Sequence, residues 1–142
     1  MTHTVRDAPG RLGRWALIAC MGFLLTACAS MLSPRTPEEQ VQARADKRWG
    51  LMIKRDFAKA YDYLTPYKRA TTTREGYLRE MGDGSSWLGY EVTSVTCEQQ
   101  LCKTKVRLDV ASPMPSKFGG KIITHIDEEW VLVDGEWWFS QR

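Results

Sequence analysis

The sequence lacks the local motifs by which many enzymes are recognised. It contains no Gly-rich phosphate loop, no G-x-S-x-G elbow and no H-E-x-x-H pair. An excess of one charge is also absent, because 20 basic and 17 acidic residues give a formal net charge of +3. A nucleic-acid-binding protein needs a strongly basic face. These absences leave no recognisable catalytic set and give no reason to expect a nucleic-acid partner.

Charged residues are also missing from one stretch near the start of the chain. An apolar run from Trp15 to Ala27 follows three arginines, and no charge appears again until Arg35. Small residues stand just before Cys28, so the segment has the three parts of an export signal. Its end, Leu25-Thr26-Ala27-Cys28, resembles the lipobox of bacterial lipoproteins.

The lipobox resemblance implies a signal peptide over residues 1–27 and a lipidated Cys28 as the first residue of the mature protein. Several acyl chains would hold the protein firmly on a membrane. Ala29 stands where the family's inner-membrane retention signal has Asp, which implies an outer-membrane location facing the periplasm. The alternative is an uncleaved anchor, because the 18 uncharged residues 15–32 just reach the length that spans a bilayer.

Two cysteines remain after Cys20 leaves with the signal and Cys28 is lipidated. Cys97 and Cys102 form an even pair in an oxidising compartment and flank a short turn between two β-rich runs. A structural disulfide is predicted there. The alternative, a C-x4-C metal or redox site, lacks further cysteine ligands, and neither a metal nor a cofactor is expected.

Three helices are predicted after a tether over residues 28–35. The first begins with Thr36 as N-cap, Pro37 at the first helical position and Glu39 closing a capping box, and it ends near Arg55. A second is predicted from Asp56 to Leu64, stopped by Thr65-Pro66. A third is predicted from a capping box at residues 72–75 to Gly82.

From Trp87 the pattern changes to alternation of apolar and polar residues, which is typical of strands. Strands are predicted over residues 87–97, 102–111, 121–133 and 136–140. Asp134-Gly135 is a strong hairpin signal between the last two. Four consecutive antiparallel strands predict a meander.

Helices followed by a curled sheet predict an α+β domain over residues 36–142, with the N-terminal helices packed on a four-stranded antiparallel sheet. The element order, the segment Asp56-Phe57-Ala-Lys-Ala60-Tyr61 and the terminal Trp137-Trp138-Phe139 resemble the NTF2-like cone fold. Nuclear transport factor 2 and ketosteroid isomerase share that fold. A cystatin-like, one-helix arrangement is the alternative.

The resemblance implies a pocket between sheet and helices. Candidate ligand-binding residues are Trp49, Tyr61, Tyr63 and Trp130; Phe57, Trp87, Tyr90 and Trp138 are further candidates for its lining. The alternative for all of these side chains is ordinary core packing.

Polar and ionisable residues are concentrated around His125 in the sequence. On a strand His125, Asp127 and Glu129 share one face, and either Asp127 or Asp109 could pair with His125 as an acid–base pair if that face were buried. The alternative is a solvated face whose acids lie opposite Lys103 and Lys105.

The leading hypothesis is therefore a non-catalytic, membrane-anchored binding or interaction module of the cell envelope. Its partner would be an envelope protein or a small apolar ligand, and a homodimer through the sheet is a further possibility of the fold. The Pro- and Gly-rich loop with Met114 and Phe118 is the predicted partner contact. The alternative function is a small isomerase or hydratase that uses His125 and an aspartate.

Overall fold

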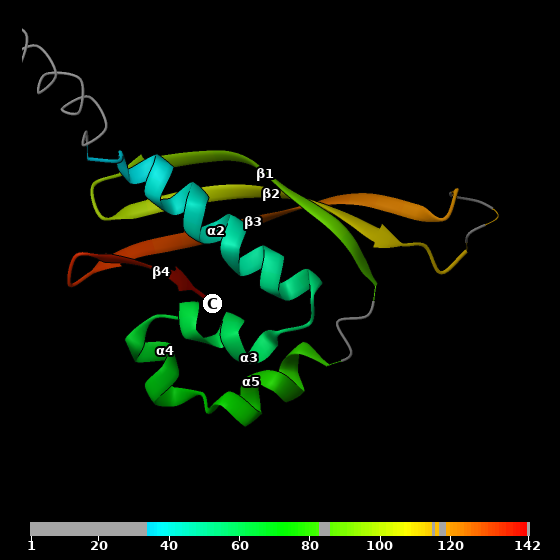
Figure 1. Ribbon diagram of the computed structural model, residues 1–142, viewed down its shortest axis with the longest axis horizontal. Coiled ribbons are helices and arrows are strands. Elements are labelled where there is room, and N and C mark those ends of the chain that lie inside the picture. Colours follow the sequence, from blue (N-terminus) through cyan, green and yellow to red (C-terminus); the bar gives the residue numbers. More distant parts are fainter. Residues whose placement is uncertain (1–33, 83–85, 115, 117–118, 142) are drawn as a thin grey trace, which may run out of the picture. The chain divides into compact units, whose positions relative to one another are not determined.

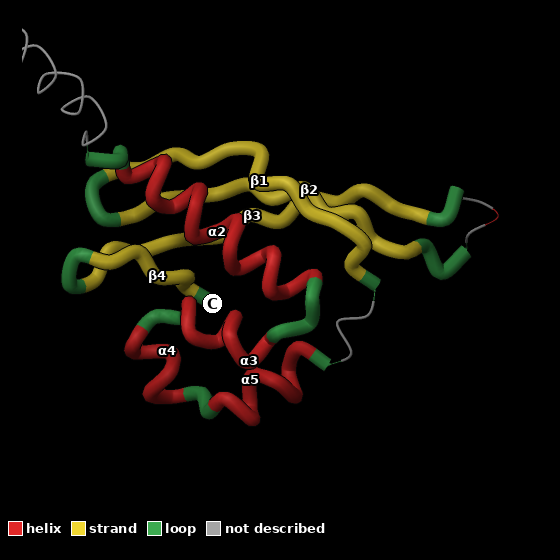
Figure 2. Tube along the Cα trace, viewed as in Figure 1, coloured by secondary structure: helices red, strands yellow, loops and turns green. Residues whose placement is uncertain are grey.

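The computed structural model describes residues 34–82, 86–114, 116 and 119–141. Helices occupy the first half of this part and strands the second (Figure 2). The predicted α+β class is confirmed. The elements are α2 (Pro37–Ile53), α3 (Phe57–Ala60), the 3-10 helix η3 (Tyr61–Tyr63), α4 (Pro66–Thr71), α5 (Arg74–Met81), β1 (Trp87–Glu98), β2 (Leu101–Ala111), β3 (Lys121–Val133) and β4 (Glu136–Ser140).

The four strands form one antiparallel sheet in the order β1-β2-β3-β4, which is the predicted meander. Asp134 and Gly135 have φ angles of 52° and 79°, as the turn between β3 and β4 requires. β4 is short, and its pairing with β3 covers only Glu129–Val133. On its other side, Phe139 forms one parallel bridge with Leu64. Within the described chain, residues 121–128 of β3 therefore have β2 on one side and no strand on the other.

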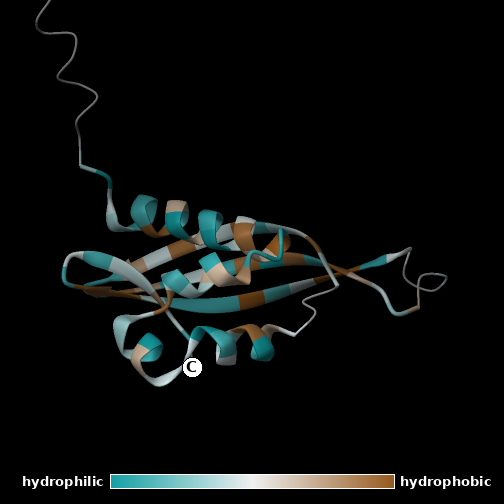
Figure 3. Cartoon of the chain, turned by 60° about the horizontal axis from the view of Figure 1, so that its bottom comes forward, coloured by the Kyte–Doolittle hydropathy of each residue, from teal (hydrophilic) through white to brown (hydrophobic). Residues whose placement is uncertain are grey.

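Helix α2 crosses one face of the sheet (Figure 1). It begins with the predicted capping box, in which Thr36 Oγ1 accepts from the Glu39 amide and the Glu39 carboxylate accepts from the Thr36 amide. Figure 3 shows polar and apolar residues alternating along α2, with apolar segments in the strands behind it. The buried side of the helix consists of Val41, Ala45, Arg48, Trp49 and Met52.

The short helices after α2 differ from the prediction. The single helix expected from Asp56 to Leu64 is divided into α3 and η3, and α4 begins at Pro66, where a stop was expected. Proline breaks a helix when it lies inside one, but the first helical position needs no N–H from it. Thr65 caps α4 by accepting a hydrogen bond from the Lys68 amide. The dipeptide therefore starts a helix here.

Helix α5 has a different cap from the predicted box. The N-cap is Thr73, whose hydroxyl accepts from the Gly76 amide at 3.1 Å. Because Gly76 stands at the third helical position, Glu75 is not the reciprocal partner that a box with Thr72 requires. The helix ends at Met81, as expected from Gly82.

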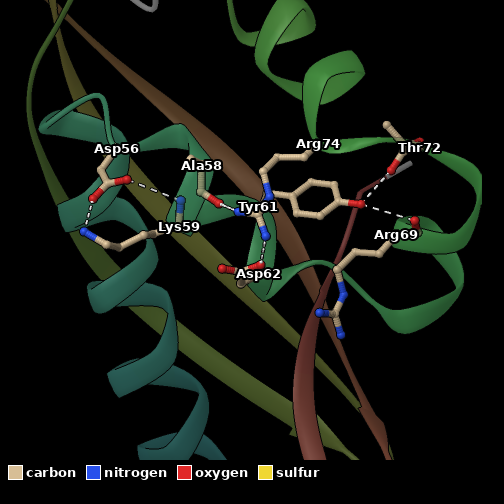
Figure 4. A network of polar contacts seen from close by, with 8 residues as sticks. All are labelled: Asp56, Ala58, Lys59, Tyr61, Asp62, Arg69, Thr72 and Arg74. Atoms are coloured by element: carbon tan, nitrogen blue, oxygen red, sulfur yellow. Dashed lines mark hydrogen bonds and ion pairs between the residues drawn. The ribbon is translucent and has the colours of Figure 1, made fainter.

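Polar contacts tie the short helices together (Figure 4). The Tyr61 hydroxyl donates to the Thr72 carbonyl at 2.7 Å. Arg74 donates to the Ala58 carbonyl and, at 2.7 Å, to the Asp62 carboxylate. Side chains thus replace the hydrogen bonds that one longer helix would have made internally.

The two faces of the sheet differ in composition. The face toward the helices is buried and mostly apolar. The opposite face carries cross-strand rows of charged residues, in which Glu91 pairs with Arg107 and Arg107 with His125. The buried strand residues of the inner face include Val92, Cys102, Val106, Leu108, Trp130, Trp137 and Phe139.

The predicted signal peptide, lipidated Cys28 and most of the tether lie outside the described residues. The same holds for the alternative anchor over residues 15–32. In the described ranges, no helix is long and apolar enough to cross a membrane.

Candidate functional site

A pocket of about 630 Å³ opens where β4 ends. Its lining includes Ser140 and Gln141 at the end of β4, and Ile126 and Glu128 on the stretch of β3 where the pairing with β4 runs out. The other lining residues come from α2, α5 and all four strands: Arg48, Trp49, Met52, Met81, Trp87, Lys103, Asp127, Glu129 and Phe139. The end of the short last strand thus lies in the lining of the hollow.

A buried ion pair lies in this pocket. Arg48 of α2 donates from Nη1 to Glu128 Oε1 of β3 at 2.6 Å, and the two side chains are only 4% and 3% exposed. The Arg48 guanidinium also lies 3.7 Å from the centre of the Phe139 ring. Stacking and ion pairing together hold the arginine in place. The pair joins the helix to the sheet across the interior.

Several polar atoms in and around the pocket keep unused hydrogen-bonding capacity. Within the described chain, Glu128 Oε2 and Arg48 Nε are buried and have no hydrogen-bond partner. The same is true of Gln141 Oε1 and of the Trp49 indole N–H. Because buried polar atoms are normally hydrogen-bonded, such a concentration marks a place where a ligand would be stabilised.

Tyr77 of α5 lies next to the ion pair and is completely buried. Burial raises the pKa of its hydroxyl, and the charge of nearby Arg48 partly opposes that shift. The hydroxyl points at the sulfur of Met52, 3.8 Å away. Tyr77 is therefore a neutral packing residue at physiological pH.

Aromatic side chains form the apolar wall. The rings of Trp49 and Trp87 meet edge to face with their centres 5.6 Å apart, and Phe57 meets Trp87 in the same manner at 6.3 Å. Tyr90 stacks on Trp49 and donates its hydroxyl hydrogen to the Asp46 carbonyl. These contacts with Phe57 and Tyr90 fix the positions of the Trp49 and Trp87 rings in the pocket lining.

Of the four predicted ligand-binding residues, only Trp49 lines this pocket. Trp130 is fully buried in the core and Tyr61 is buried against Tyr77. Tyr63 is partly exposed and lies under the Arg44 guanidinium. For these three the structure shows core or surface packing.

Neither Arg48 nor Glu128 was predicted as a site residue, although the sequence contains a signal for each. Arg48 stands three residues after Ala45 and four before Met52, so helical spacing places it on the apolar face. Glu128 stands between Ile126 and Trp130 at the alternating spacing of the buried strand face. In both cases the signal is a charged residue that stands among apolar residues at the spacing of a buried helix face or a buried strand face.

The candidate catalytic residues lie on the outer face. His125 is exposed and pairs in register with Arg107. Asp127 lies directly opposite Lys105, with its carboxylate 3.5 Å from Lys105 Nζ, and Glu129 lies opposite Lys103, as the solvated-face alternative predicted. Asp127 also lines the pocket. The structure therefore does not bury His125 with an aspartate.

Asp109 is held by two cations on that same face. Its carboxylate lies 2.8 Å from Lys121 Nζ and 3.0 Å from Arg107 Nη2. The hydrogen bond from Lys121 lowers the pKa of Asp109, and the charge of Arg107 acts in the same direction. Within the described residues, no group of three or more His, Cys, Asp or Glu side chains could hold a metal ion.

The predicted disulfide is confirmed, because Cys97 and Cys102 are bonded across the β1–β2 hairpin. Met114 is 47% exposed, while Phe118 and Cys28 lie outside the described residues. A role of this loop in partner binding stays a prediction.

Comparison with solved structures supports the fold at low sequence identity. A protein from Campylobacter jejuni described as an NTF2-like transpeptidase aligns with a TM-score of 0.53 and 9% identity, covering 70% of this chain and 96% of its own. A SEC-C motif containing protein from Rhodopseudomonas palustris aligns with a TM-score of 0.52 and 19% identity, covering 87% of each chain. No family model and no curated protein sequence matches. The chain has an α+β fold of the NTF2-like kind.

Proposed function

We propose that this protein is a non-catalytic binding module of the bacterial cell envelope, anchored through lipid on Cys28, whose pocket takes a small, mostly apolar ligand. The observation that carries the binding role is the pocket of about 630 Å³ beside the buried Arg48–Glu128 pair. Small-molecule sites typically have about 300–1,000 Å³, largely apolar walls and a few placed polar groups. The lipobox resemblance supports the anchor.

The walls of the pocket suit an apolar ligand body. The apolar lining residues are Trp49 and Met52 of α2, Met81 of α5, Trp87 of β1, Ile126 of β3 and Phe139 of β4. Burial of a ligand against such walls contributes roughly 25 cal/mol for each Å² removed from water. A ligand with one apolar ring would thus gain its affinity mainly from these contacts.

No observation favours the isomerase or hydratase alternative. His125 is exposed on the outer face, and Glu128, the buried acid of the pocket lining, is bound by Arg48. A general base must lie within reach of the proton that it removes in a dry site. The arrangement around Glu128 favours holding a ligand over transferring protons.

The anchor is tested by the intact mass of the full-length protein, expressed in a bacterium and extracted from membranes in mild detergent. The expected mass is that of residues 28–142 plus acyl groups, less two hydrogens for the disulfide. Cys28→Ser is the matched control, because it removes the acceptor thiol alone and should leave an unprocessed chain. A wild-type chain of unprocessed mass would contradict the anchor.

The pocket is tested by native mass spectrometry of the same extract and by titration with indole as a small apolar probe. Met81→Trp fills the pocket from α5 and should abolish indole binding. Leu78→Trp adds the same side chain on the same helix, at a position that is 36% exposed and outside the pocket lining, and should leave binding unchanged. Equal binding by both variants would place the ligand elsewhere.

A further inference from the structure

We propose that the ligand of this pocket carries a protonated amine on its apolar body, and that the Glu128 carboxylate binds the ammonium group. The inference rests on the proposed binding function and assigns the chemical class of the ligand. Three features of the pocket support it: the buried acceptor atom of Glu128, a second unused acceptor at Gln141, and the aromatic walls.

The acceptor is Glu128 Oε2. Glu128 is 5% exposed and lines the pocket. Its other oxygen, Oε1, accepts from Arg48, whereas Oε2 is buried and has no hydrogen-bond partner in the described chain. A buried carboxylate oxygen gains more from a charged donor than from a neutral one, because charge-assisted hydrogen bonds are about twice as strong. An ammonium N–H is such a donor.

A second unused acceptor lies in the same lining. The Gln141 side-chain oxygen is buried and has no hydrogen-bond partner in the described chain. The charged side chains do not decide between a cation and an anion, because Glu128 is paired with Arg48 and Asp127 with Lys105 on the outer face. Two unused oxygen acceptors favour a ligand that donates several hydrogen bonds, and an ammonium group is such a donor.

Arg48 is a poor receptor for an anionic ligand despite its position in the lining. One of its amino groups is bound to Glu128, and its guanidinium plane lies over Phe139, which restricts its approach to other groups. Its Nε atom is buried and can offer one hydrogen bond. Because the Glu128 carboxylate already neutralises the guanidinium, an anion would gain less from Arg48 than from an unpaired arginine.

The indole rings of the wall suit the same ligand. Trp49 and Trp87 both line the pocket. Because the Arg48 guanidinium already lies 5.5 Å from the centre of the Trp49 ring, we expect the rings to supply apolar contact area for the ligand body. The apolar part of the ligand would pack on these rings while the amine reaches Glu128. Aromatic walls combined with a buried carboxylate thus match both parts of an aromatic or alkyl amine.

The experiment compares three probes that share one phenyl ring: 2-phenylethylamine, 2-phenylethanol and 3-phenylpropanoate. Each is titrated by calorimetry at pH 7 into the full-length protein in detergent, with detergent alone as the blank. We expect the amine to bind at least about tenfold more tightly than the alcohol, the minimum expected of a hydrogen bond between charged groups. The carboxylate should bind most weakly.

The variant Glu128→Gln keeps the shape of the side chain and a carbonyl for Arg48 but removes the charge. We expect the affinity for the amine to fall about tenfold and the affinity for the alcohol to stay within about twofold. Glu91→Gln makes the same change on the outer face, at a residue that is outside the pocket lining, and should leave all three affinities unchanged.

The outcomes separate this inference from the binding function. If the alcohol or the carboxylate binds as tightly as the amine, the amine preference is wrong and the pocket remains a ligand site. If none of the three probes binds, the binding function itself is contradicted. Because the ranking is measured on the unmodified protein, it decides the question even where Glu128→Gln does not fold.

Discussion

Asp127 and Glu128 are neighbours on β3, carry the same charge and each lie near a cation, yet they occupy opposite faces of the sheet. Asp127 lies 3.5 Å from Lys105 with side chains that are 79% and 53% exposed. Glu128 lies 2.6 Å from Arg48 with side chains that are almost completely buried. One residue along a strand thus separates a solvated pair from a desolvated one.

The two contacts therefore differ in their effect on the free energy of unfolding. An exposed pair is screened by water and contributes little to the free energy of unfolding. A buried pair costs desolvation on both sides, so its net contribution is small, but loss of one partner leaves a charge stranded in the interior. The inner pair is therefore costly to break without being strongly stabilising.

The largest effect should come from breaking the inner pair. Glu128→Ala leaves the Arg48 guanidinium buried without a carboxylate, and should lower the free energy of unfolding by about 3–5 kcal/mol. Urea denaturation followed by tryptophan fluorescence measures this change. A loss below about 1 kcal/mol would mean that the guanidinium escapes to solvent and that the interior tolerates the gap.

The double variant Arg48→Met, Glu128→Leu provides the matched control. It replaces both charges with apolar side chains of similar size, which is often neutral or stabilising in other buried pairs. We expect it to recover most of the stability lost in Glu128→Ala. A double variant as unstable as the single one would show that the pair itself holds α2 on the sheet.

An intermediate effect is expected at the hairpin end of the inner face, where Cys102 is fully buried. Replacing Cys97 and Cys102 by serine opens a short covalent loop, and the chain-entropy model assigns such a loop roughly 2 kcal/mol. Urea denaturation of the oxidised protein and of the variant measures the difference. Addition of a reductant to the wild type is the control, and equal midpoints with and without reductant would contradict the prediction.

A small effect is expected from the outer pair. Lys105→Ala removes the cation opposite Asp127 and should change the free energy of unfolding by less than about 1 kcal/mol. The same urea experiment applies, and high salt should reduce even this change because exposed charges are screened. A loss of stability as large as that of Glu128→Ala would contradict the prediction that the exposed pair contributes less than the buried pair.

A further small effect on the outer face depends on pH. The hydrogen bond from Lys121 lowers the pKa of Asp109, so at low pH the unfolded chain binds this proton before the folded one does. The resulting stability is present above the unfolded pKa of about 3.9 and is lost as the pH falls through the lower folded value.

Melting temperatures between pH 5 and pH 3 test this dependence. Asp109→Asn should flatten the acid-induced fall in melting temperature, and Lys121→Met should flatten it similarly because it removes the same hydrogen bond. Parallel profiles for the wild type and both variants would show that other carboxylates dominate acid unfolding.

The sequence predicted most of the architecture because local chemistry and tertiary structure agree over long elements. Thr36, Pro37 and Glu39 specify the start of α2, and Asp134-Gly135 specifies the last hairpin. The observed bounds of β3 and β4 are the predicted ones, because alternating residues and the turn between them mark both strands clearly. In each case a capping or turn residue stood next to a clear periodic pattern.

The site was less predictable, because its polar residues act through contacts between distant elements. Arg48 and Glu128 are 80 positions apart in the chain, and only the crossing of α2 over the sheet brings them together. Among the aromatic candidates, nothing local distinguishes Trp49, which lines the pocket, from Trp130, which fills the core. The spacing of apolar residues predicts which face of a helix or strand is buried. The position of a pocket depends in addition on where the neighbouring helices and strands end.

The length of β4 links ligand binding to the exposure of the sheet edge. Because the strand ends at Ser140, residues 121–128 of β3 keep one row of backbone groups unpaired with any strand of the described chain. Extending β4 by two residues would pair part of that row but would bring its backbone toward the space beside Glu128. In this protein, a longer β4 would therefore reduce the volume for a ligand while protecting more of the exposed sheet edge.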